Sequence, residues 1–201
     1  VNGLWRGPED AYEVERMRIA IAGAGMAGSY MLRLLNEKGK DEVVLFDEVK
    51  TTGCGQRPCA WGMAPSIEYR RLVGRFLDPE RYVNLRSDRV KIDGITMGAD
   101  LLTVDKPSLI KDMVGGAQVR HGALDPDDYD LVVDATGVER AYLGKVEGDD
   151  LIAELCQYRL GSENDLGTWL RTSTWGYGWC FPLGNGEYHV GYGNLPPHVG
   201  A

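Results

Sequence analysis

The sequence predicts an α/β fold in which a parallel sheet is followed by an antiparallel β layer. Residues 18–48 read as apolar strand, glycine-rich turn, helix and second strand, an order that predicts a parallel pair joined by a right-handed crossover. After about residue 150 the composition of the sequence changes, because eight aromatic residues lie in the segment from Tyr158 to Tyr192. We therefore expect an N-terminal extension at 1–16, a first domain at 17–150 with inserted strands at about 81–104, and an antiparallel segment at 151–201.

Composition places the chain among ordinary globular proteins. Its 201 residues are 43% hydrophobic and 26% charged, which is enough to bury a core. The net charge of −8 argues against a nucleic-acid partner, because such binding depends on Lys and Arg that neutralise phosphates. No apolar run approaches the roughly 20 residues that span a bilayer, and no secretory signal opens the sequence. We therefore expect a cytoplasmic protein.

The cysteines are too few for a disulfide scaffold; they are Cys54, Cys59, Cys156 and Cys180. Because no second Cys or His pair accompanies Cys54 and Cys59, no metal site is predicted. Structural roles are expected for the last three cysteines and for His189, whose side chain we expect to be hydrogen-bonded.

Apolar periodicity defines the elements of the first domain. Residues 18–22 read as a strand, residues 31–35 have helical spacing that ends at a cap on Gly39, and residues 43–46 read as the second strand. The segment 50–61 is rich in Gly, Pro and Cys and is expected to be a loop. A helix is expected at about 65–77, strands around Val90 and at 101–104, a short helix from about Pro107, and a strand at 117–121.

Two later segments complete the expected sheets. Residues 130–134 form a short apolar run ending in a tight turn, which is typical of a buried parallel strand, and we expect this strand to join the first sheet. Residues 177–181 and 188–192 flank the turn 184–186, which predicts an antiparallel hairpin.

A glycine-rich motif follows the first strand; it reads Gly23-Ala24-Gly25-Met26-Ala27-Gly28 and fits G-x-G-x-x-G. In this pattern the first glycine permits a tight turn, the second lets the backbone approach a pyrophosphate, and the third allows close packing of the helix on the sheet. Free amides and the positive end of the helix dipole then favour phosphates. The sequence therefore predicts a dinucleotide site at Gly23, Gly25, Met26, Ala27 and Gly28.

The acidic residue that accepts ribose hydroxyls is expected about 20 positions after this motif. Asp47 stands there, with Glu48 as the neighbouring alternative. A carboxylate at this place repels a 2′-phosphate, so NADP is disfavoured, whereas NAD and FAD both stay open.

The later motifs resemble the geranylgeranyl reductase family of FAD-dependent oxidoreductases, which is related in fold to p-hydroxybenzoate hydroxylase. Tyr177, Trp179, Phe181 and Pro182, followed by Gly191 and Gly193, reproduce that family's Y-x-W-x-F-P-x(7,8)-G-x-G pattern. The resemblance spans about residues 19–193 and implies FAD as the cofactor. It also implies that the first four residues of the pattern line a prenyl-chain pocket in the antiparallel substrate layer. Aromatic side chains that only fill the core of the sheet are the open alternative.

Two shorter motifs support the same resemblance. Ala135-Thr136-Gly137 resembles the A-T-G turn that this superfamily places close to the cofactor, and Cys54-Gly55 resembles the Cys-Gly found beside the flavin. The resemblance implies that Cys54 is catalytic and assists protonation of the alkene, since a thiol in a suitable environment can donate a proton near neutral pH. A purely structural Cys54 is the open alternative.

The implied activity is hydride transfer from reduced FAD to a carbon–carbon double bond of a prenyl lipid, with electrons from an external donor such as NAD(P)H or ferredoxin. Because isoprenoid chains partition into membranes, peripheral contact with a bilayer stays open. A flavin-dependent monooxygenase of the same fold and a truncated, non-catalytic FAD-binding paralogue are the alternatives.

The sequence departs from the family after the hairpin. Family members continue into a Gly-Asp segment that contacts FAD, and no such segment stands between Gly193 and Ala201. We therefore expect a chain that lacks the C-terminal part of the family fold. It is either a fragment, or a chain that associates with itself as a homo-oligomer or is completed by a second chain.

Overall fold

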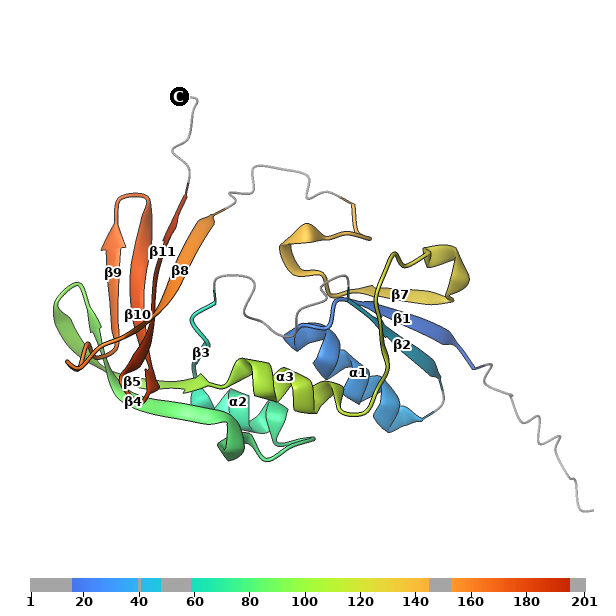
Figure 1. Ribbon diagram of the computed structural model, residues 1–201, viewed down its shortest axis with the longest axis horizontal. Coiled ribbons are helices and arrows are strands. Elements are labelled where there is room, and N and C mark those ends of the chain that lie inside the picture. The colour runs from blue at the N-terminus through green and yellow to red at the C-terminus, as the bar shows by residue number, and fades with distance from the viewer. Residues whose placement is uncertain (1–15, 40, 48–58, 145–152, 196–201) are drawn as a thin grey trace, which may run out of the picture.

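The computed structural model describes residues 16–39, 41–47, 59–144 and 153–195. Within these ranges the chain forms two separate sheets and three α-helices (Figure 1). One sheet is parallel and the other is largely antiparallel, so the predicted α/β class is confirmed. In Figure 1 the parallel sheet lies on the right, the larger sheet on the left, and the helices between and below them.

The parallel sheet has four strands in the order β6-β2-β1-β7. They are β1 (Arg18–Ala22), β2 (Glu42–Phe46), β6 (Val119–Arg120) and β7 (Leu131–Asp134). The central strand β1 is buried on both faces, which explains its uninterrupted apolar run. The strands expected at 18–22, 43–46, 117–121 and 130–134 are confirmed, as is the joining of the last of them to the first sheet.

Helix α1 (Met26–Lys38) covers one face of this sheet and packs Leu32 against Ile21 and Leu45. It ends where the sequence predicts, because Gly39 adopts a left-handed φ of 65° and donates its N–H to the Asn36 carbonyl oxygen at 3.1 Å. The other face is covered without an α-helix by Leu124 and by segment 129–142, which includes the short turn η3 (Gly137–Glu139).

The second sheet has seven strands in the order β3-β5-β4-β9-β10-β11-β8. They are β3 (Gly62–Met63), β4 (Val83–Ile92), β5 (Ile95–Val104), β8 (Glu154–Gly161), β9 (Trp169–Ser173), β10 (Gly176–Gly184) and β11 (Glu187–Asn194). The hairpin β10-β11 confirms the strands expected at 177–181 and 188–192. Strands β8 and β9 were not predicted, because their polar residues give no alternating pattern.

The long ribbon β4-β5 belongs to this second sheet, although the sequence places it as an insertion in the first domain. Its turn is Asp93-Gly94, with φ values of 47° and 91°, the left-handed pair typical of two-residue hairpin loops. The Asp93 carboxylate accepts hydrogen bonds from the Thr172 backbone N–H and hydroxyl at 2.8 and 2.6 Å. These bonds tie the ribbon to β9, a pairing between distant segments that sequence periodicity does not reveal.

Helices α2 (Ser66–Val73) and α3 (Lys106–Val114) form a second core against β5, with Tyr69, Leu102 and Leu109 at its centre. The expected helix at 65–77 ends early, at a cap on Gly74. The helix near Pro107 is confirmed and begins at Asp105, whose carboxylate accepts the Ser108 N–H at 3.1 Å. Helix α1 is joined to α3 by Arg33, which donates to the carbonyl oxygens of Asp112 and Met113 at 2.5 and 2.6 Å.

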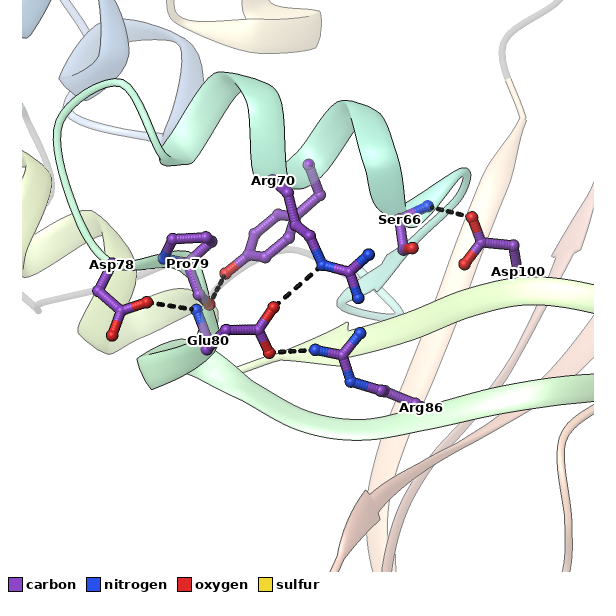
Figure 2. A network of polar contacts seen from close by, with 8 residues as sticks. Ser66, Arg70, Asp78, Pro79, Glu80, Arg86 and Asp100 are labelled. Carbon is purple, nitrogen blue, oxygen red and sulfur yellow. Dashed lines mark hydrogen bonds and ion pairs between the residues drawn. The ribbon is translucent and has the colours of Figure 1, made fainter.

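A polar network centred on Glu80 connects α2 to the ribbon (Figure 2). Glu80 lies in the turn η1 (Pro79–Tyr82). Its carboxylate accepts a hydrogen bond from Arg70 of α2 at 3.0 Å and also forms an ion pair with Arg86 of β4. Asp100 of β5 accepts the Ser66 N–H at 3.0 Å and so caps α2 from outside the helix. Since the ion pairs are about half exposed, each contributes modestly, and we assign this network a structural role.

Candidate functional site

The glycine-rich turn has the geometry that a pyrophosphate requires. Gly23 has a φ of 98°, and a Cβ there would lie 2.5 Å from the Ala135 carbonyl oxygen. Gly28 is buried against the Gly23 carbonyl oxygen and lies close to the Ala135 methyl group, so no larger residue fits. Gly25, in contrast, is exposed and has no atom within 4 Å of an added Cβ. The first and third glycines therefore serve packing, and the second faces open space.

The N-terminus of α1 is available to an anion. Gly25 is its N-cap residue and offers no side-chain cap, and the first turn carries no acidic residue. Among the four N–H groups that begin any helix, those of Met26 and Ala27 belong to this open turn. Free N–H groups and the positive end of the helix dipole together favour a phosphate at this place.

The Ala135-Thr136-Gly137 turn lies directly beside this motif and is organised by Asp134. The Asp134 Oδ1 atom accepts the Thr136 N–H and hydroxyl at 2.9 and 2.6 Å. Its Oδ2 atom accepts the N–H groups of Tyr142 and Leu143 at 2.9 and 3.0 Å. Partial burial alone would raise the pKa of Asp134, but these hydrogen bonds outweigh it and lower the pKa.

Asp47 stands at the carboxyl end of β2, next to the strand that enters the glycine turn. Its backbone N–H bonds to the Arg120 carbonyl oxygen at 2.9 Å, and its own carbonyl oxygen contacts His121 Nδ1 at 2.8 Å. His121 therefore lies beside Asp47, a contact for which the sequence carries no signal. The predicted residues Glu48, Cys54 and Gly55 lie outside the described residues.

An aromatic face of the antiparallel sheet forms the second half of the candidate site. In the β10-β11 register Tyr177 pairs with Gly193, Trp179 with Gly191, and Phe181 with His189. Residues paired directly across strands share a face, so the three aromatic side chains lie on one face, as predicted. Trp179 and Phe181 are buried and Tyr177 is 48% exposed. This face, defined by Tyr177, Trp179 and Phe181, is called the aromatic face below.

Pro182, the fourth residue expected in the substrate pocket, is not brought to the aromatic face. It pairs with Tyr188 and lies on the opposite face of the sheet. There it lines a groove of about 350 Å³ between β4 and the β10-β11 turn, together with residues that include Arg86 and Asp165. This volume is at the small end of the range for ligand pockets.

His189 corrects a prediction, because its side chain is not fully hydrogen-bonded. The ring is buried, bonds to the backbone carbonyl of Ala60, and leaves Nδ1 without a partner. Removal from water lowers the pKa of His189, so the ring is neutral. An unpaired buried nitrogen is uncommon in folded proteins and marks a place where a function can be sought.

Trp61 connects the segment 59–63 to the antiparallel sheet. Its indole meets the His189 ring edge to face, with 4.5 Å between centroids. The Trp61 backbone has a φ of 59°, a left-handed conformation that is rare for a bulky residue and is often found at functional sites. Two residues further on, Met63 packs against the same core as Met26 of the glycine motif. The glycine turn and the aromatic face are therefore linked through residues 61–63.

Comparison with known proteins places this site in a flavoprotein fold. No protein family model matches the chain. Among curated proteins it is similar to the uncharacterized protein MJ1182 of Methanocaldococcus jannaschii, with 24% identity over 87% of this chain and 60% of that protein. The chain thus spans less than two thirds of that relative's length.

Similar solved structures include three that are named for flavin or hydroxylation chemistry. The peptidyl tryptophan dihydroxylase QhpG matches with a TM-score of 0.63 at 16% identity, over 93% of this chain and 48% of its own. The flavin-dependent halogenase CmlS matches with a TM-score of 0.63 at 18% identity, over 90% of this chain and 42% of its own. A flavoprotein/dehydrogenase from Cytophaga hutchinsonii matches with a TM-score of 0.59 at 14% identity, over 90% of this chain and 56% of its own. These likenesses establish the fold.

Among the described helices, none has the length and apolar character needed to cross a bilayer.

Proposed function

We propose that this chain binds FAD and forms the cofactor and substrate layers of an FAD-dependent reductase that acts on carbon–carbon double bonds of prenyl lipids. The open turn at Gly25 carries the cofactor part of this proposal. In it Gly23, Gly25 and Gly28 form the pyrophosphate cradle, Asp47 accepts ribose hydroxyls, and the 135–137 turn borders the cofactor. The residues fit the group, since the cradle is open and holds no acidic side chain in the first turn of α1.

The aromatic face supports an apolar substrate. Tyr177 is half exposed, and its ring lies 5.5 Å from that of the buried Trp179 at a tilt of 42°, so Tyr177 offers apolar surface to a ligand. Aromatic surfaces of this kind bind apolar chains by excluding water from both partners. Together with the resemblance to geranylgeranyl reductases, this surface favours a prenyl chain over a polar substrate.

When bound, reduced FAD supplies the hydride, which is chemistry that no amino-acid side chain provides. The chain's own residues would orient the substrate and exclude water from it. Trp179 and Phe181 keep one side of the substrate dry, and Asp134 holds the 135–137 turn in one conformation. Cys54 is the proposed proton donor to the neighbouring carbon, as the family resemblance implies.

A flavin-dependent monooxygenase is the second candidate, and the names of similar structures favour it. They include a dihydroxylase and two tetracycline destructases, Tet(51) and Tet(55). A monooxygenase would consume oxygen with NAD(P)H and hydroxylate its substrate. A reductase would instead add two hydrogens to each double bond and leave no oxygen in the product.

The remaining parts of the proposal concern partners. Because the chain spans about 60% of its curated relative, the rest of the flavin site would come from a further segment, a second copy or a complementing chain. An external donor, NAD(P)H or ferredoxin, would reduce the flavin. A prenyl substrate would be drawn from a membrane by transient peripheral contact, from a cytoplasmic location.

Cofactor binding is tested by titrating FAD into the 201-residue chain and following the visible flavin spectrum. Gly25→Asp is the decisive variant, because Asp is a favoured N-cap residue and there is space for it, yet its carboxylate repels a pyrophosphate. We expect unchanged or higher thermal stability and loss of FAD binding. Gly116→Ala, at an open position away from the turn, is the matched control. If Gly25→Asp binds FAD like the wild type, the cradle is not the pyrophosphate site.

The reaction class is tested separately, on the protein that binds flavin. The reduced protein is mixed with a geranylgeranyl lipid in detergent, and the products are analysed by mass spectrometry. A gain of two hydrogens per double bond supports the reductase. Oxygen uptake with an aromatic substrate and a product that gains oxygen would replace it with the monooxygenase.

A further inference from the structure

A cysteine and a lysine that the function above does not use are in direct contact. Lys106 Nζ, at the first residue of α3, lies 3.1 Å from Cys59 Sγ. Cys59 is partly exposed and is not in a disulfide. No sequence pattern predicts this contact, because 47 positions separate the two residues.

The surroundings favour the charged form of the sulfur. A lysine ammonium in contact with a thiol stabilises the thiolate. A charge on Cys59 would also act on the buried imidazole of His189, where it tends to raise the pKa. Cys59 and His189 are therefore electrostatic neighbours.

Among the described residues, the other charged side chains that act on His189 form an ion pair with each other. Arg159 and Glu187 form an ion pair at 2.5 Å, and both act on His189. Asp105 is occupied as the cap of α3, where it accepts the Ser108 N–H and hydroxyl. Lys106 is a cation in direct contact with the sulfur, and a substitution at position 106 can remove its charge.

We propose that Cys59 is a nucleophilic thiol, held as a thiolate by Lys106, and that it is a site of covalent modification by soft electrophiles at carbon. In the reaction the Sγ lone pair forms a bond to the electrophilic carbon, and the leaving group departs with its bonding electrons. With iodoacetamide the products are the carboxamidomethyl thioether and iodide. The step needs neither flavin nor an oxidant, so it stands or fails independently of the proposed reductase.

The test measures alkylation rates by mass spectrometry of peptides from the full chain, treated with iodoacetamide between pH 6 and pH 9. Cys156 and Cys180 are internal references; burial raises the pKa of Cys180 to about 11, so it should react slowest. We expect Cys59 to react at pH 6.5 at least tenfold faster than Cys156, with little further gain toward pH 9. Lys106→Met should remove this advantage, and Lys106→Arg should restore part of it.

Lys111→Met, on the exposed side of the same helix, is the matched control and should leave the Cys59 rate unchanged. Thermal melts establish whether each variant is folded, and the Lys106→Arg comparison keeps the test valid if Lys106→Met is not. The proposal is overturned if wild-type Cys59 is no faster than Cys156 at pH 6.5. A Cys59 rate that is the same with Lys, Arg or Met at position 106 would overturn it equally.

Discussion

The indole of Trp179 lies directly over the backbone of Gly191 on the neighbouring strand. A Cβ at position 191 would stand 2.7 Å from Trp179 Cε2 and 2.5 Å from the Cys156 carbonyl oxygen. The Trp179 ring is thereby held flat against the sheet, with its Nε1–H 3.3 Å from the Gln157 side-chain oxygen. The spacing between tryptophan and glycine in the motif is thus a packing requirement of two strands in register.

Gly191→Ala should displace this indole and destabilise the protein. The added methyl group overlaps ring and backbone atoms at once, so we expect the free energy of unfolding to fall by about 1–3 kcal/mol. Urea unfolding followed by tryptophan fluorescence measures the change. Gly161→Ala on the adjoining strand has open space around its Cβ and should cost less; equal losses would show that the Trp179 contact is not the cause.

Asp134→Asn should loosen the turn at 135–137. The carboxylate accepts four hydrogen bonds, two on each oxygen, and an amide must turn its NH₂ group toward one pair of donors. We expect a loss of about 1–3 kcal/mol in unfolding free energy and faster amide exchange at Thr136 and Tyr142. Hydrogen-exchange mass spectrometry reads the second effect. Asp128→Asn, at an exposed position, should change neither quantity.

Stability should fall in mild acid because of His189. Its pKa is lowered in the folded state, so between the usual value of about 6.5 and the folded value the unfolded chain binds the extra proton. Unfolding free energy therefore decreases as the pH falls through that window, by up to about 1.4 kcal/mol per pH unit.

His189→Phe should flatten this dependence, since phenylalanine does not titrate and its ring can still meet Trp61. Urea midpoints at pH 7.5 and pH 5.5 give the comparison. An unchanged slope in His189→Phe would assign the acid sensitivity to another group.

Tyr177→Ala should weaken binding of an apolar substrate without affecting the cofactor. The ring is 48% exposed on the aromatic face and contacts no residue of the glycine motif among the described ring contacts. We expect a rise in KM for a prenyl lipid of about tenfold and an unchanged Kd for FAD. Tyr158→Ala removes a tyrosine that is 61% exposed on the opposite face, so it should leave both constants unaltered. If both variants lose substrate affinity equally, the aromatic face is not the binding surface.

Much of the fold was predictable because its signals are local. The strand, glycine turn and helix of 18–39 follow from apolar periodicity and from steric limits on Gly23 and Gly28, and the hairpin of β10 and β11 follows from alternation around a glycine turn. The polar strands β8 and β9 escaped prediction because their order comes from hydrogen bonds to neighbouring strands. For the same reason, the sequence does not show that β4 and β5 belong to the second sheet.

The sequence by itself determined the glycine turn at 23–28 and the shared face of Tyr177, Trp179 and Phe181, since short-range geometry dictates both. The binding roles of this turn and of Asp47 stay predictions. Only the tertiary structure decided that Pro182 leaves this face, that His189 is buried with an unpaired nitrogen, and that Lys106 meets Cys59. Those contacts join residues that are far apart along the chain. Their positions depend on how two sheets and three helices pack within the described part of the chain, and no local pattern encodes that packing.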